Sequence, residues 1–505
     1  MSLAFGLAFL SGFVALSHEI IWYRVLSFTT GGAADAFALM LGAYLLGIAL
    51  GSAAARALCR DGDENARAVP LQAVSYLFAA SALAFLLPPA IAGFVTVIEA
   101  WQITLPLVVA AAGLLGAVFP LVSHATIPPD ARSGGRIALV YFANILGAAA
   151  GSLGTGFWLL DFWPLWRVAL ALALASLAAA GLLVVFRERP GRRFAAQLAA
   201  FAGVGLAFAV YAPALYGSLY EKLQFKGGYR PGEAFAHIVE NKSGVITVTA
   251  DGSIYGGGSY DGGFNTSLRS DRNGIVRAYA VAALHPRPRE VLMIGLSSGS
   301  WAAVIADLPG VERLTIVEIN PGYLELLPRY PIVSSLLKHP KVRIEIDDGR
   351  RWLVRNRARR FDAVISNTTA HWRANVTNLL SAEFLELVKS HLENGGVFYF
   401  NTTGSDRAVR TATQVFPHTL RFANFVACSE AALSFDAGKW RRMLESYVVG
   451  GERVVEPDRA GDRRLLDALG ASLRHEWLET DESLRARSAG LVPITDDNMG
   501  TEWGR

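Results

Sequence analysis

Cysteine is nearly absent from this 505-residue chain, which contains only Cys59 and Cys428. Two cysteines so far apart in the sequence provide neither a disulfide framework nor a cysteine metal site. Charged residues are also scarce, at 18% of the chain, whereas hydrophobic residues make up 52% and the mean hydropathy is +0.33. The net charge of +4 is too small to indicate a nucleic-acid partner. Low charge and high hydropathy together indicate a membrane protein.

Apolar runs are concentrated before about residue 217. A helix needs roughly 20 apolar residues to cross a ~30 Å hydrocarbon core, and about seven stretches meet that requirement. The first has no basic n-region and contains His18 and Glu19, so we expect it to remain in the mature protein rather than be cleaved as a signal peptide. We therefore predict a multi-pass α-helical membrane domain at residues 1–217, with the lipid bilayer as its partner, and a linker at 218–235. The predicted stretches are approximately 3–25, 34–57, 70–95, 103–125, 137–159, 163–186 and 194–217.

Arginine is distributed unevenly among the short loops between these stretches. The loops after the second, fourth and sixth stretches are rich in arginine, whereas "GFVTVIEAWQ" and "LLDFWP" have no Lys or Arg. The positive-inside rule then places the N-terminus in the cytoplasm of a bacterial-type inner (cell) membrane. If all seven stretches span, the C-terminal part lies outside the cytoplasm; if the seventh does not, it lies inside. The loop arginines are Arg56, Arg60, Arg67, Arg132, Arg136, Arg187, Arg189, Arg192 and Arg193.

Two features of the apolar stretches bear on transport. Glycines four residues apart, such as Gly147 and Gly151, favour close helix packing over a substrate path. An ionisable Glu19 inside a helix favours an ion pair with Arg24 or with a neighbouring helix over an ion or proton site. Only Glu19 favours a transporter.

After residue 235 the pattern changes to short, turn-rich segments. In "SGVITVTADGSIY" the β-branched residues alternate before an Asp251-Gly252 turn, so we predict a small antiparallel β-sheet at residues 236–270. From residue 271 to 505, strand patterns alternate with helix patterns. This alternation predicts a Rossmann-like, methyltransferase-type doubly wound parallel sheet.

Candidate ligand-binding residues follow the first three strands of that sheet. "EVLMIGLSSGSWAAVIADLPGVERLTIVEIN" reads as a strand, a turn with Gly295 and Gly299, a helix, and a second strand that ends at Glu318. Such a turn lets the backbone approach a ligand, and an acid about 20 residues later accepts hydrogen bonds from ribose hydroxyls. The third strand ends at Asp347, Asp348 and Gly349, where a carboxylate could accept from an adenine amino group.

NAD enzymes favour the three glycines of G-x-G-x-x-G, whereas this turn has Gly295 and Gly299 with Ser297 and Ser298 between them and is followed by an Asp-Asp-Gly strand end, so the pattern favours adenosyl-sulfonium binders. More narrowly, residues of about 236–402 resemble the spermidine synthase family, the aminopropyltransferases of polyamine biosynthesis, in "VEIN", "DDG" and the order of elements. "LSHEIIWYRVLSF", "YLLGIALGS" and the closing "ITDDNMGTEWGR" resemble members of this group that are fused to membrane helices.

The resemblance implies a transferase that binds S-adenosylmethionine, its decarboxylated form or methylthioadenosine. It places Glu318 at the ribose and Asp348 with Gly349, beside Asp347, at the adenine edge. The turn from Gly295 to Gly299, including Ser297 and Ser298, is implied at the amino-acid-derived end of the ligand.

The sequence departs from the family at the residues that handle the acceptor. The family typically has Gly-Gly-Gly-Asp-Gly-Gly at the turn, where this chain has Ser298 at the Asp position, and Asp-Ser-Ser-Asp-Pro after the fourth strand. "FDAVISNTTAHW" has Asn367, Thr368, Thr369, Ala370 and His371 there. Because an amide is not a base, we expect an acceptor other than putrescine.

Two residues are candidates for the missing base. His371 titrates near neutrality, and Asp261 lies in the glycine-rich "GGGSYDGG" that we expect to overhang the crevice. A hydrogen-bonding structural histidine and a plain turn aspartate are the alternatives. For the whole chain, the alternatives to a transferase are a non-catalytic nucleoside-binding or scaffold domain in a membrane assembly, and a regulatory domain of a transporter. A homodimer or a membrane-complex partner is left open.

Overall fold

The computed structural model of the chain describes residues 2–59, 64–187, 189–367, 370–498 and 500–503. Two compact units are present. The first consists of residues 1–30, 35–235 and 240–245, and the second consists of residues 31–34, 236–239 and 246–505. The connection between the first two long helices therefore belongs, by its contacts, to the second unit. Arg60, Thr368 and Thr369 of the sequence predictions lie outside the described residues.

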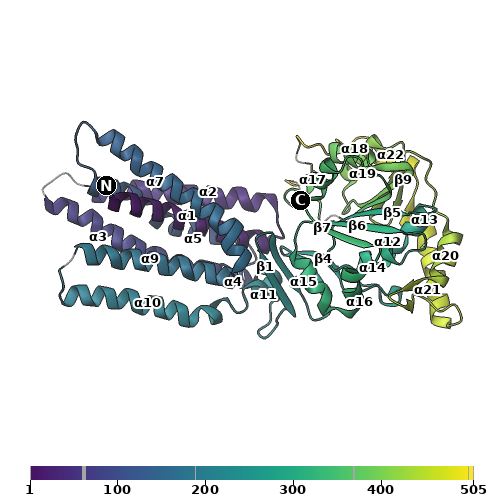
Figure 1. Cartoon of the computed structure of the whole chain (residues 1–505), viewed down its shortest axis with the longest axis horizontal. Coiled ribbons are helices and arrows are strands. Elements are labelled where there is room, and N and C mark those ends of the chain that lie inside the picture. Colours follow the sequence, from purple (N-terminus) through teal and green to yellow (C-terminus); the bar gives the residue numbers. More distant parts are fainter. Residues whose placement is uncertain (1, 60–63, 188, 368–369, 499, 504–505) are drawn as a thin grey trace. The chain divides into compact units, whose positions relative to one another are not determined.

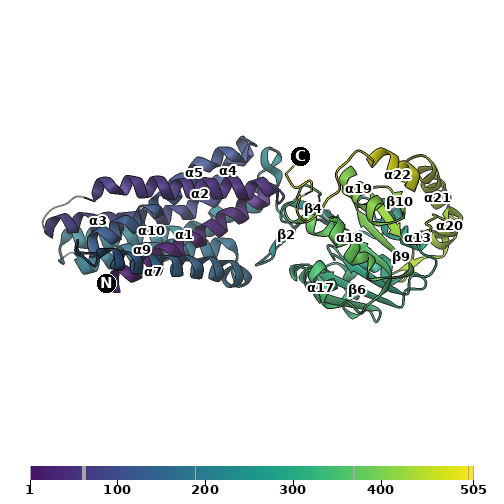
Figure 2. The ribbon, with the colours of Figure 1, turned by 90° about the horizontal axis from the view of Figure 1, so that it is seen from above.

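The first unit is a bundle of apolar helices (Figures 1 and 2). Among the described residues, seven helical stretches are long and apolar enough to cross a membrane, by length and composition: Ser2–Thr29, Ala34–Leu58, Val69–Val97, Trp101–Thr126, Ser133–Phe162, Leu165–Phe186 and Arg192–Tyr216. They agree in number and order with the predicted stretches. Their α-helices are α1 (Ser2–Thr29), α2 (Ala34–Ala55), α3 (Glu64–Ser81), α4 (Leu87–Val97), α5 (Leu105–Gly116), α6 (Val118–Thr126), α7 (Ser133–Leu153), α8 (Leu160–Phe162), α9 (Leu165–Arg187) and α10 (Arg192–Tyr216), and α11 (Leu219–Phe225) follows them.

Glycines set the closest helix contacts in this bundle. A Cβ atom at Gly147 of α7 would overlap the main-chain oxygen of Phe9 in α1, and one at Gly151 would overlap that of Phe13. A Cβ at Gly51 of α2 would likewise overlap α5. Their small size is thus required where two helix backbones meet, which confirms the packing interpretation.

Of the two pairings predicted for Glu19, the ion pair with Arg24 does not occur among the described residues. The Arg24 guanidinium donates to the main-chain oxygen of Asn241 at 2.7 Å. Side chains five residues apart on an α-helix point about 140° away from each other, so Glu19 and Arg24 face different neighbours.

A four-stranded sheet, most of whose residues belong to the second unit, has the order β1 (His237–Asn241), β2 (Gly244–Val248), β3 (Ser253–Gly256) and β4 (Ser259–Gly263), and its β2, β3 and β4 pair antiparallel. The predicted turn at Asp251-Gly252 joins β2 to β3, where Val248 pairs with Ile254. Gly252 has a φ of +82°, a conformation that glycine adopts without strain. Asp261 lies within β4 and not in a turn, which was the alternative for this residue.

An eight-stranded sheet forms the core of this unit, in the order β14-β10-β11-β9-β8-β5-β6-β7. The strands from β9 to β7 are parallel, as predicted, whereas β11, β10 and β14 extend the sheet through antiparallel pairs. The strand order reverses between β5 and β8, and ligands of such sheets bind at the carboxyl ends of the strands near this reversal. The bounds are β5 (Glu290–Ile294), β6 (Arg313–Glu318), β7 (Val342–Ile346), β8 (Phe361–Ser366), β9 (Leu392–Asn401), β10 (His418–Phe422), β11 (Phe425–Ser429) and β14 (Leu478–Glu479), with a separate pair β12 (Val448–Val449) and β13 (Glu452–Arg453).

Helices cover both faces of this sheet because its strands are apolar on both sides. In β5, Val291 and Met293 belong to one buried cluster, and Leu292 and Ile294 belong to the other. On the first face lie α12 (Val276–Tyr279), α13 (Val281–Leu284), α14 (Ser300–Ala306), α15 (Gly322–Leu326), α16 (Pro331–Ser334), α20 (Ala437–Ser446) and α21 (Ala460–Ser472). On the second lie α17 (Gly349–Arg355), α18 (Ala382–Lys389), α19 (Asp406–Val415) and α22 (Asp481–Ser488).

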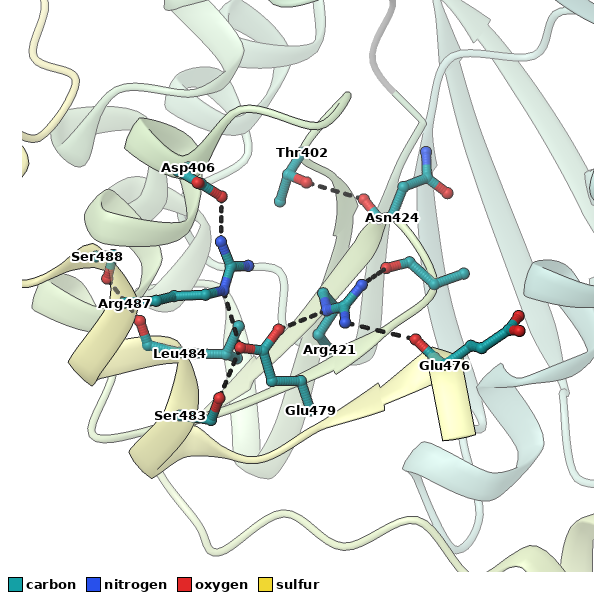
Figure 3. Close-up of polar contacts among 11 residues, drawn as sticks. Thr402, Asp406, Arg421, Asn424, Glu476, Glu479, Ser483, Leu484, Arg487 and Ser488 are labelled. Atoms are coloured by element: carbon teal, nitrogen blue, oxygen red, sulfur yellow. Dashed lines mark hydrogen bonds and ion pairs between the residues drawn. The ribbon is translucent and has the colours of Figure 1, made fainter. Parts of the chain in front are cut away.

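An ion-pair network fastens the C-terminal segment to the sheet edge (Figure 3). Arg421 of β10 donates to Glu479 of β14 at 2.7 Å, and Arg487 of α22 donates to the same carboxylate at 2.8 Å. Arg487 also pairs with Asp406 of α19. Because these contacts fix α22, the tail after it returns to the carboxyl edge of the sheet in a defined position.

Candidate active site

The turn after β5 provides the floor of the candidate site. Gly295, Ser297 and Gly299 have φ values of +92°, +49° and +78°. A Cβ at Gly295 would find only the main-chain oxygen of Asn367 within 4 Å, at 3.9 Å, so this glycine leaves room for a ligand. A Cβ at Gly299 would lie 2.8 Å from Leu327, so this second glycine serves helix packing instead.

Glu318, at the end of β6, lies against this turn. Its side chain is 4% exposed and accepts hydrogen bonds from the backbone N–H of Leu296 at 2.7 Å and of Asn320 at 2.8 Å. Burial raises the pKa of Glu318 to about 7, although the backbone N–H groups oppose this shift, and the charge of Asp261 adds to it. The structure thus brings Glu318 and the glycine turn together, as the sequence spacing predicted.

Strand β4 lies over the turn and brings Asp261 to it. The Tyr323 hydroxyl donates to the Asp261 carboxylate at 2.5 Å, and the Ser297 hydroxyl donates to the Asp261 main-chain oxygen at 2.5 Å. Burial raises the pKa of Asp261, whereas the Tyr323 hydrogen bond and the Arg373 charge oppose the rise. A partly buried carboxylate with a raised pKa is a candidate general base.

The Ser298 hydroxyl, at the position of the family aspartate, is also used within the protein. It donates to the main-chain oxygen of Gly263 at 2.9 Å and is 4% exposed. Ser297 and Ser298 therefore tie the glycine turn to β4. Because both hydroxyls are bonded within the protein, a ligand would contact the backbone of Ser297 and Ser298 more than their hydroxyls.

The carboxylates after β7 already have partners. Asp347 forms ion pairs with Arg351 and Arg355, and Asp348 accepts from the backbone N–H of Arg351 at 2.7 Å as the N-cap of α17. A Cβ at Gly349 would lie 2.6 Å from the Ile294 side chain, so this glycine allows α17 to pack on β5. Their local roles are structural, and a contact of Asp348 with adenine would use its second oxygen.

The segment after β8 is held from two sides. Ala374 donates its N–H to the main-chain oxygen of Gly32 at 2.9 Å, and Ala33 forms an isolated β-bridge with Arg373. On the other side, Glu502 accepts from two backbone N–H groups, those of Asn375 at 2.9 Å and Thr377 at 2.8 Å. Both the helix connection 31–34 and the C-terminal tail therefore position this segment.

His371 lies in that segment and is partly buried. Its main-chain oxygen accepts from the Thr501 hydroxyl at 2.9 Å, and among the described residues its Nδ1 atom has no hydrogen-bond partner. Burial lowers the pKa of His371, so the ring is neutral at pH 7 and able to accept a proton.

Asn367, directly after β8, accepts a hydrogen bond from Asn401 at 3.1 Å. Asn401 is in turn bonded to Asn424, and Asn424 to Arg277. Sequence reasoning missed these three residues, and it also missed Tyr323 and Arg373. The only available signal was Asn401, a polar residue at the end of the fifth strand; the others come from separate parts of the chain.

A parallel sheet with antiparallel edge strands and a glycine turn after its first strand place the C-terminal region in the doubly wound class of α/β domains. More specifically, residues 278–409 match the family described as the Spermine/spermidine synthase domain. The C-terminal region of this chain thus carries a spermine/spermidine synthase domain.

The curated relatives are aminopropyltransferases. A polyamine aminopropyltransferase of Mycobacterium tuberculosis is 27% identical over 371 residues, which cover 70% of this chain and 69% of the relative. Polyamine aminopropyltransferase 2 of Ralstonia nicotianae is 26% identical over 460 residues, which cover 85% of this chain and 84% of the relative. Matches of these lengths exceed the 270 residues from 236 to 505 (505 − 235), so the similarity extends into the helical region.

Two solved structures are similar at low scores. A spermidine synthase in complex with the transition state analogue AdoDATO has a TM-score of 0.36 and 18% identity, and covers 46% of this chain and 84% of its own. Human methyltransferase-like protein 13 in complex with SAH has a TM-score of 0.26 and 19% identity, and covers 39% of this chain and 90% of its own.

Proposed function

We propose that this chain is a membrane-anchored transferase that binds decarboxylated S-adenosylmethionine, or S-adenosylmethionine, and transfers a group from its sulfonium to an acceptor other than putrescine. The match to the spermine/spermidine synthase domain and the aminopropyltransferase relatives support aminopropyl transfer. The helical stretches support a bilayer as the partner of the first unit.

The observation that carries the proposal is the buried carboxylate of Glu318 beside the open backbone at Gly295. Each oxygen of Glu318 accepts one backbone N–H and keeps a further lone pair, to which a ligand could donate. The two ribose hydroxyls of an adenosyl group would do so, while the thioether or sulfonium end extends over Gly295 toward Asn367.

The reaction itself is a displacement at carbon. A lone pair of the acceptor forms a bond to the methylene carbon beside the sulfonium, and the electron pair of the breaking carbon–sulfur bond goes to sulfur. Methylthioadenosine leaves as a neutral thioether when the donor is decarboxylated. The acceptor loses a proton, which we assign to His371 or Asp261, because both lie at this edge and Asn367 is not a base.

The charges of the segment after β8 indicate the class of acceptor. No acidic residue occurs between Asp362 and Glu383, so the segment offers no charge to attract a diamine. The Arg373 side chain brings a positive charge to the same segment. These charges support an acceptor other than putrescine.

Calorimetry with the full-length protein in detergent tests the proposal. We expect methylthioadenosine to bind, because its ribose reaches Glu318 and its thioether needs no acceptor. Absence of binding would contradict both the nucleoside pocket and the proposed transferase function. Binding without transfer to any acceptor would favour the second candidate function, a non-catalytic nucleoside-binding domain. The internal partners of Asp347 and Asp348 also favour this candidate.

A further inference from the structure

A chain of four polar side chains runs from the partly buried Arg277 to the end of β8. Arg277 Nη1 donates to Asn424 Oδ1 at 2.8 Å, Asn424 Nδ2 donates to Asn401 Oδ1 at 2.8 Å, and Asn401 Nδ2 donates to Asn367 Oδ1 at 3.1 Å. We call these residues the amide relay.

The direction of the amide relay is fixed at its buried end. A guanidinium can only donate, so the amide next to it must turn its oxygen toward Arg277 and its nitrogen toward Asn401. Arg277 itself is held by donation to the main-chain oxygens of Gly274 and Asn273, both at 2.8 Å, and by the ring of Phe425.

A second donor of fixed direction confirms the orientation of the middle residue. The backbone N–H of Thr403 donates to Asn401 Oδ1 at 2.8 Å, and a backbone N–H cannot reverse its role. The Thr402 hydroxyl donates to the main-chain oxygen of Asn424 at 2.9 Å and so holds Asn424 in place (Figure 3). Asn401 therefore turns its Nδ2 toward Asn367.

The consequence for the site lies at Asn367. Asn401 uses one of the two lone pairs of the Asn367 oxygen, and both N–H groups on Nδ2 remain for a ligand. The strand end thus offers a ligand two hydrogen-bond donors, which a carboxylate would not. The change from a family aspartate therefore adds donors as well as removing a charge.

Arg373 adds a positive charge at the same edge. Two glycines leave room for its side chain: a Cβ at Gly257 would lie 2.6 Å from Nη2, and a Cβ at Gly32 would lie 2.7 Å from Nε. Among the ion pairs of the described residues none involves Arg373, although its charge acts on Asp261. An arginine without an ion-pair partner is suited to a carboxylate.

We propose that the acceptor is bound through a carboxylate, or another anionic hydrogen-bond-accepting group, by Nδ2 of Asn367 and the guanidinium of Arg373. This inference rests on the proposed transferase function and names the class of its acceptor. An ammonium group at this position would meet two sets of donors and a like charge. Arg277, Asn424 and Asn401 are positioning residues, since they act through Asn367.

Two probes with the same four-carbon spacing test this inference on the full-length protein in detergent, saturated with methylthioadenosine. 4-Aminobutyrate carries one carboxylate where putrescine carries a second ammonium group. We expect calorimetry to give at least about tenfold tighter binding of 4-aminobutyrate, the size of one charge-assisted hydrogen bond. Equal or tighter binding of putrescine, or binding of neither probe, would overturn the inference. Failure of methylthioadenosine to bind would instead overturn the proposed function.

Variants separate the polarity from other effects. We expect Asn367→Asp to lose the preference for 4-aminobutyrate, since its oxygens repel a carboxylate and attract an ammonium group. In Arg277→Gln the direction of the amide relay is no longer fixed, because glutamine can accept as well as donate. This variant should reduce the preference for 4-aminobutyrate over putrescine several-fold. Arg277→Lys keeps a pure donor and should retain the preference.

Circular dichroism of each variant serves as the control for folding, because the thioether of methylthioadenosine is proposed to extend toward Asn367. An unchanged preference in both Asn367→Asp and Arg277→Gln, with methylthioadenosine still bound, would show that the amide relay does not set acceptor polarity. A loss of preference in Arg277→Lys equal to that in Arg277→Gln would also contradict its role.

Discussion

At the scale of single residues, Glu318 carries the nucleoside assignment. We expect Glu318→Ala to weaken methylthioadenosine binding by about 2 kcal/mol or more, because charge-assisted hydrogen bonds to the ribose are lost. Calorimetry measures the change, and Glu312→Ala, an exposed glutamate six residues earlier, is the matched control. Equal affinity in the two variants would show that the ribose lies elsewhere.

The raised pKa of Glu318 makes this binding dependent on pH. With a pKa of about 7, most Glu318 carboxyls are ionised at pH 8 and protonated at pH 6 in the free protein. Ribose hydroxyls donate to the ionised form, so we expect affinity for methylthioadenosine to fall about tenfold from pH 8 to pH 6. Calorimetry at the two pH values measures the change, and a flat profile would place the ionisation outside the site.

Contacts between single residues could be predicted from the sequence where one local pattern contains both residues of the contact. Glu318 and the glycine turn lie in adjacent β-α-β elements, so their spacing alone predicts the contact with Leu296. The amide relay could not be predicted, because Arg277, Asn401 and Asn424 come from three distant segments whose meeting depends on the antiparallel strands.

At the scale of elements, the segment 370–377 is the least regular part of the site and depends on the connection between α1 and α2. Gly32 has a φ of +84°, and its missing Cβ leaves room for Arg373. We expect Gly32→Ala to loosen this segment, since a left-handed non-glycine residue costs about 1–3 kcal/mol. Trypsin should then cleave after Arg373 several-fold faster.

Gly42→Ala is the matched control, because a Cβ at Gly42 of α2 has no heavy atom within 4 Å. Equal cleavage rates in Gly32→Ala and Gly42→Ala would contradict the role of residues 31–34 in holding the segment. Methylthioadenosine binding should remain the same in both variants, since the glycine turn is not touched.

The parallel strands β5 to β9 were predictable as elements because each is a short apolar run bounded by glycine or polar residues. The antiparallel extension was not predicted. β14 consists of only Leu478–Glu479 and pairs with β10 over a separation of about 58 residues, which no local pattern reveals. Its place depends on long-range contacts such as the ion pair of Arg421 with Glu479.

At the scale of the whole molecule, seven helical stretches precede the transferase domain, and an odd number of spans places the two ends of the bundle on opposite sides of a membrane. The loop arginines favour a cytoplasmic N-terminus, so we expect the C-terminal domain outside the cytoplasm. A phosphatase fused at the C-terminus should then be active and a fluorescent protein dark. The reverse result would require an even number of spans and would place the domain beside a cytoplasmic supply of adenosyl sulfonium.

The central claim is that the nucleoside site is retained while the diamine site is not. Its most direct test incubates the full-length protein with decarboxylated S-adenosylmethionine and labelled putrescine and measures spermidine by mass spectrometry. Positioned general-base help is typically worth 10² to 10⁴ in rate, and Asn367 supplies neither a base nor a negative charge. We therefore predict at most trace spermidine from a protein that binds methylthioadenosine. Turnover near that of spermidine synthases would contradict the claim and would show that His371 or Asp261 serves a diamine at this site.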